Sequence, residues 1–170
     1  TTTELAAAIL GQNQRRTIAA GNIGTPVCAV AGQSRELDVL TLEVSSFQLE
    51  TIDAFRPNIA VLLNFAPDHL DRHGSMENYI RAKARLFENQ EPFDRAIIQM
   101  DAWRELQRLG IGVPAKVLTF SATDEAADLH LNRSLLISRL PGWTGPVLDL
   151  EECRLKGHHN AENLLAALLV

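Results

Sequence analysis

The chain has 170 residues, of which 46% are hydrophobic and 22% charged, and this is the composition of a globular domain long enough to bury a core. A net charge of −5 and the lack of a Lys/Arg cluster argue against a nucleic-acid-binding protein. No apolar run reaches the roughly 18 residues of a membrane-spanning helix, and no signal peptide opens the chain, so we expect no membrane partner.

The two cysteines indicate the cellular compartment, and the first residues indicate the extent of the protein. Cys28 and Cys153 lie far apart and show no metal-binding spacing, which favours free thiols in a reducing cytoplasm. The opening TTTELAAAILG is not a natural protein start. We therefore expect residues 1–170 to be one domain of a longer cytoplasmic protein.

Apolar, strand-like runs alternate with helical segments along most of the chain. Runs that are apolar on both faces are typical of a parallel sheet covered on both sides, which predicts an α/β fold with a mostly parallel sheet and helices on both faces. The expected strands are 16–20, 38–44, 59–63, 95–100 and 116–121. The expected helices are 1–10, 27–32, 45–54, one that follows Ser75, 101–109 and 155–170. Short alternating segments over 128–150 predict a small antiparallel side sheet.

The first helix begins with three threonines. Such residues follow a phosphate-binding loop of the form GxxxxGK[ST], which would stand just upstream of Thr1. A threonine-rich helix cap without a ligand explains the same letters.

Polar side chains stand where three expected strands end. Asn22 and Gly24 belong to a glycine-rich turn, Glu43 ends the second strand, and residues 64–69 with His69 follow the third. Ligands of open α/β sheets bind beyond the carboxyl ends of the strands, so these groups are expected to meet at one edge. The alternatives are a tight turn that needs no ligand, a solvated strand end and a helix cap.

Lys83 lies in the middle of an apolar helical stripe. If Ser75 caps this helix, a periodicity of about 100° per residue places Lys83 among apolar residues. One interpretation is that its stem lies on the apolar face while the ammonium reaches water. The other is a neutral amine that takes up carbon dioxide to become a carbamate, an oxygen ligand suited to Mg²⁺. The stripe comprises Met76, Tyr79, Ile80, Leu86 and Phe87, and the opposite, polar side comprises Glu77, Asn78, Arg81, Arg85 and Glu88.

The last helix opens with polar residues. Asn160 and Asn163 are three positions apart and share a face, where they could read a planar ligand such as adenine. A helix-capping role for Asn160 remains the simpler alternative.

Taken together, DHLDRHGSMENY followed by AKARLF, and GHHNAENLLAA, resemble motifs of the Mur ligase family, the ATP-dependent enzymes that add amino acids to the peptidoglycan precursor. The likeness covers the whole chain as the central, P-loop NTPase-like ATP-binding domain, and is weak over 100–155. AGNIGTPV and LEVSSFQLE are similar to members that add D-glutamate to UDP-N-acetylmuramoyl-L-alanine. Relatives that add diaminopimelate or lysine usually have histidine where Phe47 stands.

The resemblance implies roles for individual residues. Lys83 would be a carbamylated lysine that holds a magnesium ion with His69, and Glu43 would hold a second magnesium near the ATP phosphates. Asn22, Gly24, Ser45 and His69 would lie along the UDP-sugar substrate. Thr1, Asn160 and Asn163 would contact the nucleotide.

The chain also departs from the family pattern. The Gly-Lys pair of the phosphate loop is not in it, nor are the family's UDP-binding N-terminal and amino-acid-binding C-terminal domains. We therefore expect these residues alone to be inactive. Three alternatives stay open: another ligase of this fold, which adds a different amino acid or glutamates to folate, a non-catalytic nucleotide-binding module, and a metal-dependent hydrolase built on a carbamylated lysine.

Overall fold

A computed structural model describes residues 1–155 and 157–170, and in these residues the parallel strands form two sheets. β1 (Thr17–Gly21) pairs in parallel with β2 (Val39–Glu43). β3 (Ile59–Leu62), β4 (Arg95–Gln99) and β5 (Lys116–Ser121) pair in parallel within a six-stranded sheet. The five strands expected from apolar runs are thus confirmed to within about a residue at each end.

The antiparallel segment is also confirmed, and it extends the larger sheet. β6 (Leu129–Asn132) pairs in parallel with β5 on one side and antiparallel with β7 (Leu135–Leu140) on the other. β8 (Trp143–Asp149) completes the order β3-β4-β5-β6-β7-β8. The change of strand direction therefore takes place within one sheet, at β6.

The helices match the predicted segments with shorter bounds. Residues 45–54 form only one helical turn, and the last helix begins at His158. The helices are α1 (Thr2–Gln12), α2 (Val27–Val30), α3 (Ser46–Leu49), α4 (Leu70–His73), α5 (Met76–Ala84), α6 (Met100–Arg108) and α7 (His158–Leu168), with 3₁₀ turns η1 (Ala31–Glu36), η2 (Arg85–Phe87) and η3 (Leu150–Glu152).

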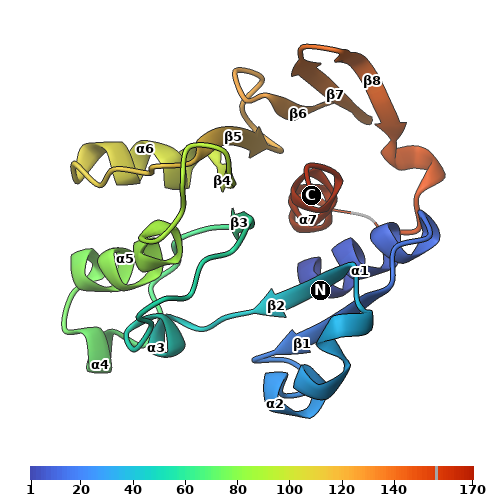
Figure 1. Cartoon of the computed structure of the whole chain (residues 1–170). Coiled ribbons are helices and arrows are strands. Elements are labelled where there is room, and N and C mark those ends of the chain that lie inside the picture. The colour runs from blue at the N-terminus through green and yellow to red at the C-terminus, as the bar shows by residue number, and fades with distance from the viewer. Residues whose placement is uncertain (156) are drawn as a thin grey trace.

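Helices cover both faces of the larger sheet because β4 is apolar on both sides. Ala96 and Ile98 point to a core that includes Ile80 of α5 and Leu106 of α6. Ile97, between them in the strand, points to a second core shared with α7, as the two-residue period of a strand requires. The predicted arrangement of helices on both faces is confirmed (Figure 1).

The first and last helices lie side by side. α1 packs against α7 and against both strands of the smaller sheet, so it joins the two ends of the described chain to β1 and β2 (Figure 1).

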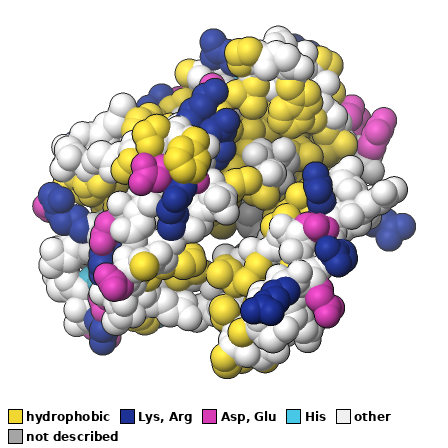
Figure 2. All heavy atoms as spheres, in the orientation of Figure 1, with side chains coloured by type: hydrophobic (Ala, Val, Ile, Leu, Met, Phe, Trp, Pro, Cys, Tyr) yellow, Lys and Arg dark blue, Asp and Glu magenta, His cyan; other side chains and the backbone are white. Residues whose placement is uncertain are grey.

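The surface carries side chains of both charges. On the face drawn in Figure 2 the basic and acidic side chains are interspersed. Within residues 1–155 and 157–170, the helices are all too short or too polar to traverse a lipid bilayer.

Candidate functional site

The ends of β1 and β2 meet through their backbones. Gly21 pairs with Glu43, and the backbone N–H of Asn22 donates to the Glu43 carbonyl at 2.8 Å. The N–H of Gly21 donates to the Thr25 carbonyl at 2.9 Å, which closes the turn that contains Gly24. The geometry thus places Asn22 beside Glu43, as expected for neighbouring parallel strands.

Ser45 follows β2 and begins α3. Its hydroxyl accepts the backbone N–H of Gln48 at 3.3 Å, and its own N–H donates to the Gln48 side chain at 2.8 Å. This reciprocal capping box explains why so short a helix forms directly after the strand. It also fixes the Ser45 hydroxyl close to the end of β2.

Lys83 reaches back to the end of β3. The Ser75 cap is confirmed, since its hydroxyl accepts the N–H of Asn78 at 3.1 Å, and the stripe residues Tyr79, Ile80 and Phe87 are buried. Lys83 itself is half-buried. Its Nζ donates to the Asn64 carbonyl at 3.3 Å and lies 4.9 Å from the centre of the Tyr79 ring. The amine is thus held at a strand end.

His69 has an unusual backbone. It precedes α4 with φ 51° and ψ 31°, a left-handed conformation that costs a non-glycine residue free energy and is concentrated at functional sites. Its side chain is 50% exposed, and its Nε2 lies 3.4 Å from an Asp68 carboxylate oxygen. The ring centre of His69 also lies 4.8 Å from that of Phe47 on α3. This contact shows that the segments following β2 and β3 meet.

The predicted metal ligands Glu43, His69 and Lys83 come from these neighbouring segments but are not hydrogen-bonded or ion-paired with one another in the part of the chain that the structure describes. Within the same described residues, no group of three His, Cys, Asp or Glu side chains is arranged to hold a metal ion. A carboxylate and an imidazole are chemically suitable ligands, whereas the Lys83 amine becomes one only as a carbamate. The magnesium site remains a prediction.

A cavity of about 560 Å³ lies at the ends of the larger sheet's strands. It is bounded by Asn64 after β3, by Gln99 at the end of β4 and by Thr123 after β5. On α7, His158, His159 and Glu162 complete its walls. Gln99 donates to Glu162 at 3.2 Å, so the cavity has a hydrogen-bonded polar wall. Its lining combines polar and apolar side chains and includes the carboxylates of Asp101, Glu105 and Glu162. Its position beyond the strands is where open α/β sheets bind ligands.

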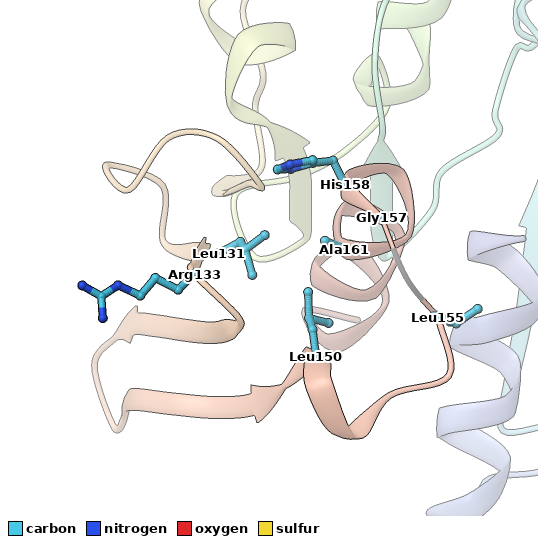
Figure 3. A pocket seen from close by; sticks show the side chains of 7 residues that line it. All are labelled: Leu131, Arg133, Leu150, Leu155, Gly157, His158 and Ala161. Atoms are coloured by element: carbon cyan, nitrogen blue, oxygen red, sulfur yellow. The ribbon is translucent and has the colours of Figure 1, made fainter.

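A second, smaller cavity of about 190 Å³ lies between the β6–β7 hairpin and α7 (Figure 3). Leu131, Leu150 and Ala161 point into it, while the Arg133 side chain extends away (Figure 3). Aliphatic side chains form most of its lining, and Arg133 and His158 are the titratable residues among those that line it.

The predicted nucleotide residues come from the start of α1 and the first half of α7, two helices that pack against each other. Thr1 precedes α1 and makes no side-chain capping hydrogen bond. Thr2 Oγ1 donates to Asn163 Oδ1 at 2.6 Å and so ties the two helices together. Asn160 is half-buried one turn before Asn163. The structure therefore brings Asn163 to the start of α1, next to Thr1 in the chain, and the roles of Thr1, Asn160 and Asn163 toward a nucleotide stay predictions.

A buried polar cluster around His73, four residues after His69, is not evident from the sequence. His73 Nε2 lies 3.1 Å from Ser46 Oγ, and His73 Nδ1 lies 3.3 Å from Glu50 Oε1. A hydrogen bond from Arg72 to Glu50, at 2.6 Å, lowers the pKa of that carboxyl, which is therefore ionised at neutral pH. The available signal was the spacing of Ser46 and Glu50, which places both on one face of a helical turn.

The prediction that Arg85 lies on the solvent side of the helix is wrong. Arg85 begins η2, directly after α5, and is half-buried. Its guanidinium donates to the backbone carbonyls of Glu50 at 2.5 Å and Ile52 at 2.9 Å. The segment after α3 is thereby fastened to η2, which follows α5, because a half-buried guanidinium can satisfy several carbonyls at once.

The Mur ligase middle domain model matches residues 1–170, the whole chain. The chain belongs to the Mur ligase family. It is 43% identical over 171 aligned residues to the UDP-N-acetylmuramoylalanine–D-glutamate ligase of Acidobacterium capsulatum, covering 99% of this chain and 37% of that protein. The equivalent ligase of Koribacter versatilis is 42% identical, with 100% and 38% covered.

Solved Mur ligase structures share the fold. A UDP-N-acetylmuramoyl-L-alanyl-D-glutamate–2,6-diaminopimelate ligase is 29% identical with a TM-score of 0.72, covering 99% of this chain and 40% of that one. MurF ligase from Thermotoga maritima in complex with ADP is 19% identical with a TM-score of 0.63, over 99% and 41% of the two chains, which supports the fold alone. The chain thus spans 37% and 38% of the two curated relatives named above.

Proposed function

We propose that the protein is an ATP-dependent ligase that joins D-glutamate to the L-alanine carboxyl of UDP-N-acetylmuramoyl-L-alanine in the cytoplasm, and that residues 1–170 are its central ATP-binding domain. The observation that carries this proposal is the contact between Phe47 and His69, which brings the segment after Glu43 next to the segment after Asn64. The full-chain likeness to relatives named as D-glutamate ligases supports the same substrates.

The chemistry explains why these residue types are needed. The precursor's carboxylate oxygen attacks the γ-phosphorus of ATP and ADP leaves, giving an acyl phosphate. The amine nitrogen of D-glutamate then attacks the acyl carbon, loses a proton, and inorganic phosphate leaves. Two anions must first approach each other, so stabilisation of negative charge is the main demand on the site.

The residues divide this work between them. Glu43, His69 and carbamylated Lys83 would hold magnesium, which supplies positive charge at the phosphate oxygens when bound. Thr1, Asn160 and Asn163 would hold the nucleotide at the start of α1 and α7. Asn22, Gly24, Ser45 and His69 would orient the UDP-sugar substrate. The chain's own contribution is to fix these groups on strand ends and helix starts.

The test is release of phosphate from ATP by the full-length protein. We expect release to require both D-glutamate and UDP-N-acetylmuramoyl-L-alanine, with a product of the mass of the D-glutamyl conjugate. Diaminopimelate, lysine and a folate with glutamate serve as alternative substrates. Turnover with one of these instead would identify another ligase of the family, and ATP binding without any acceptor-dependent release would identify a nucleotide-binding module.

A further inference from the structure

We propose that His73 is a positioning residue that sets the place of His69 relative to Lys83. The inference rests on the proposed function to the extent that it treats these two residues as catalytic. It is carried by a continuous series of ring contacts, here called the ring stack, formed by His69, Phe47, His73 and Tyr79.

The ring stack connects His69 to Lys83 without a gap. Phe47 lies 4.8 Å from His69 and 5.5 Å from His73, measured between ring centres, and is nearly parallel to His73 with an interplanar angle of 12°. His73 lies 5.4 Å from Tyr79, and the Lys83 Nζ lies 4.9 Å from the Tyr79 ring centre. These separations are within the range of favourable aromatic and cation–π contacts. We therefore expect a shift of the His73 ring to displace Phe47 and Tyr79, and through them His69 and Lys83.

His73 is the member of the ring stack that polar contacts hold on both sides. Its Nε2 meets the Ser46 hydroxyl and its Nδ1 meets the Glu50 carboxylate, both on or beside α3. The second oxygen of Glu50 accepts from Arg72, whose guanidinium lies 5.0 Å from the Phe47 ring centre. The imidazole thus clamps α3, which carries Phe47, onto α4, which His69 precedes.

Ser46, His73 and Glu50 also follow the order of a hydroxyl, imidazole and carboxylate relay, as in serine hydrolases. Here Ser46 is 5% exposed and His73 is 7% exposed. A substrate carbonyl has no access to the Ser46 hydroxyl at that depth. His69, in contrast, has half of its side chain in solvent and can contact a substrate. Burial therefore favours a positioning role.

Positioning has a measurable consequence because catalysis depends steeply on geometry. The variant His73→Phe keeps an aromatic ring but leaves Ser46 Oγ and Glu50 Oε1 without their imidazole partner. In the full-length protein we expect kcat to fall by about 10- to 100-fold, with KM for ATP changed by less than about threefold. The Mg²⁺ concentration for half-maximal rate should rise.

The matched control is Leu136→Ala, a fully buried position on β7 in the other core. It should lower the thermal midpoint while leaving kcat and the Mg²⁺ requirement as in wild type. A fall in kcat of equal size in both variants at equal loss of thermal stability would overturn the proposal, as would wild-type kinetics in His73→Phe.

A second readout does not depend on turnover. The Phe47 ring shifts the proton resonances of His69 through its ring current, so His73→Phe should move the His69 ring signals in NMR spectra of histidine-labelled protein, and Leu136→Ala should not. Unmoved His69 signals reject the positioning role by themselves. If the wild-type protein shows no acceptor-dependent phosphate release, the proposed function fails, and the NMR comparison still decides whether His73 places His69.

Discussion

Gly21 and Glu43 approach each other so closely that a Cβ atom on Gly21 would lie 2.2 Å from the Glu43 carbonyl oxygen. Gly21 also has φ +113°, a region that side-chain-bearing residues rarely adopt. The end of β1 can therefore sit beside the end of β2 only with glycine at this position.

We expect Gly21→Ala to destabilise the protein by at least about 1–3 kcal/mol, because both the backbone conformation and the contact with β2 become strained. It should also lower ligase activity by displacing Glu43. Urea unfolding and kcat measure the two effects. Gly32→Ala is the control, since Gly32 has nothing within 4 Å of an added Cβ. Equal stability of the two variants would show that the strain is relieved.

Lys83 offers a test of the carbamate. Lys83→Ala in the full-length protein should reduce kcat by about 10²–10⁴-fold, which corresponds to roughly 3–5 kcal/mol of transition-state stabilisation. A short carboxylic acid such as acetate should restore part of the rate by supplying the lost carboxylate. Lys83→Arg is the matched control, because it keeps a positive charge but forms no carbamate. Full activity of Lys83→Arg would mean that the cation, held at the Asn64 carbonyl, is what the reaction needs.

The hydrogen bond between Thr2 and Asn163 predicts a coupling in nucleotide binding. Thr2→Val keeps the shape of the side chain and removes the donor to Asn163 Oδ1. We expect a loss of about 1 kcal/mol, seen as a roughly fivefold higher KM for ATP. Asn163→Ala should raise KM further, and the double variant should cost less than the sum of the two. Strict additivity would indicate that Thr2 does not act through Asn163.

Acid stability should depend on Asp94. Arg56 donates to both carboxylate oxygens, at 2.9 and 3.2 Å, and the Glu91 N–H donates at 2.8 Å. The hydrogen bond from Arg56, followed by that from Glu91, lowers the pKa of Asp94 below its ordinary value of 3.8. The unfolded chain therefore binds the proton more readily than the folded one.

This difference in proton binding sets the direction in which stability changes with pH. The contribution of Asp94 is fully present above the pKa of the unfolded state and is lost as pH falls through the lower folded pKa. The urea midpoint of wild type should thus decline below pH 4, and Asp94→Asn should be less stable at pH 6 and decline less steeply in acid. Asp53→Asn, at an exposed position, is the comparison. Parallel pH profiles for wild type and Asp94→Asn would contradict the assignment.

The sequence predicted the strands well because each is a short run of apolar residues between polar or glycine-rich segments. Lys116–Ser121, for instance, was predicted with its observed bounds. Helix ends are less predictable from the sequence, since the chain after Leu49 is bound to Arg85 of η2 instead of continuing the helix. That interaction joins residues 35 positions apart, and no local pattern reveals it.

Some candidate site residues can be chosen from the sequence because their chemistry does not suit the local pattern. Glu43 interrupts an apolar strand and Lys83 interrupts an apolar stripe, so both stand out in the sequence. His73 did not, because the contacts that single it out involve four residues on other segments: Ser46, Phe47, Glu50 and Tyr79. The division of the parallel strands into two sheets depends equally on tertiary contacts.

The bond from Thr2 to Asn163 spans 161 positions. During synthesis, α1 therefore leaves the ribosome long before α7, its packing partner, exists. A nascent chain must keep the apolar side of α1 from misassociating during that interval, and such late closure slows folding. We expect the packing of α7 against α1, where the predicted nucleotide residues lie, to be the last part of this domain to mature, and bound ATP to favour its completion.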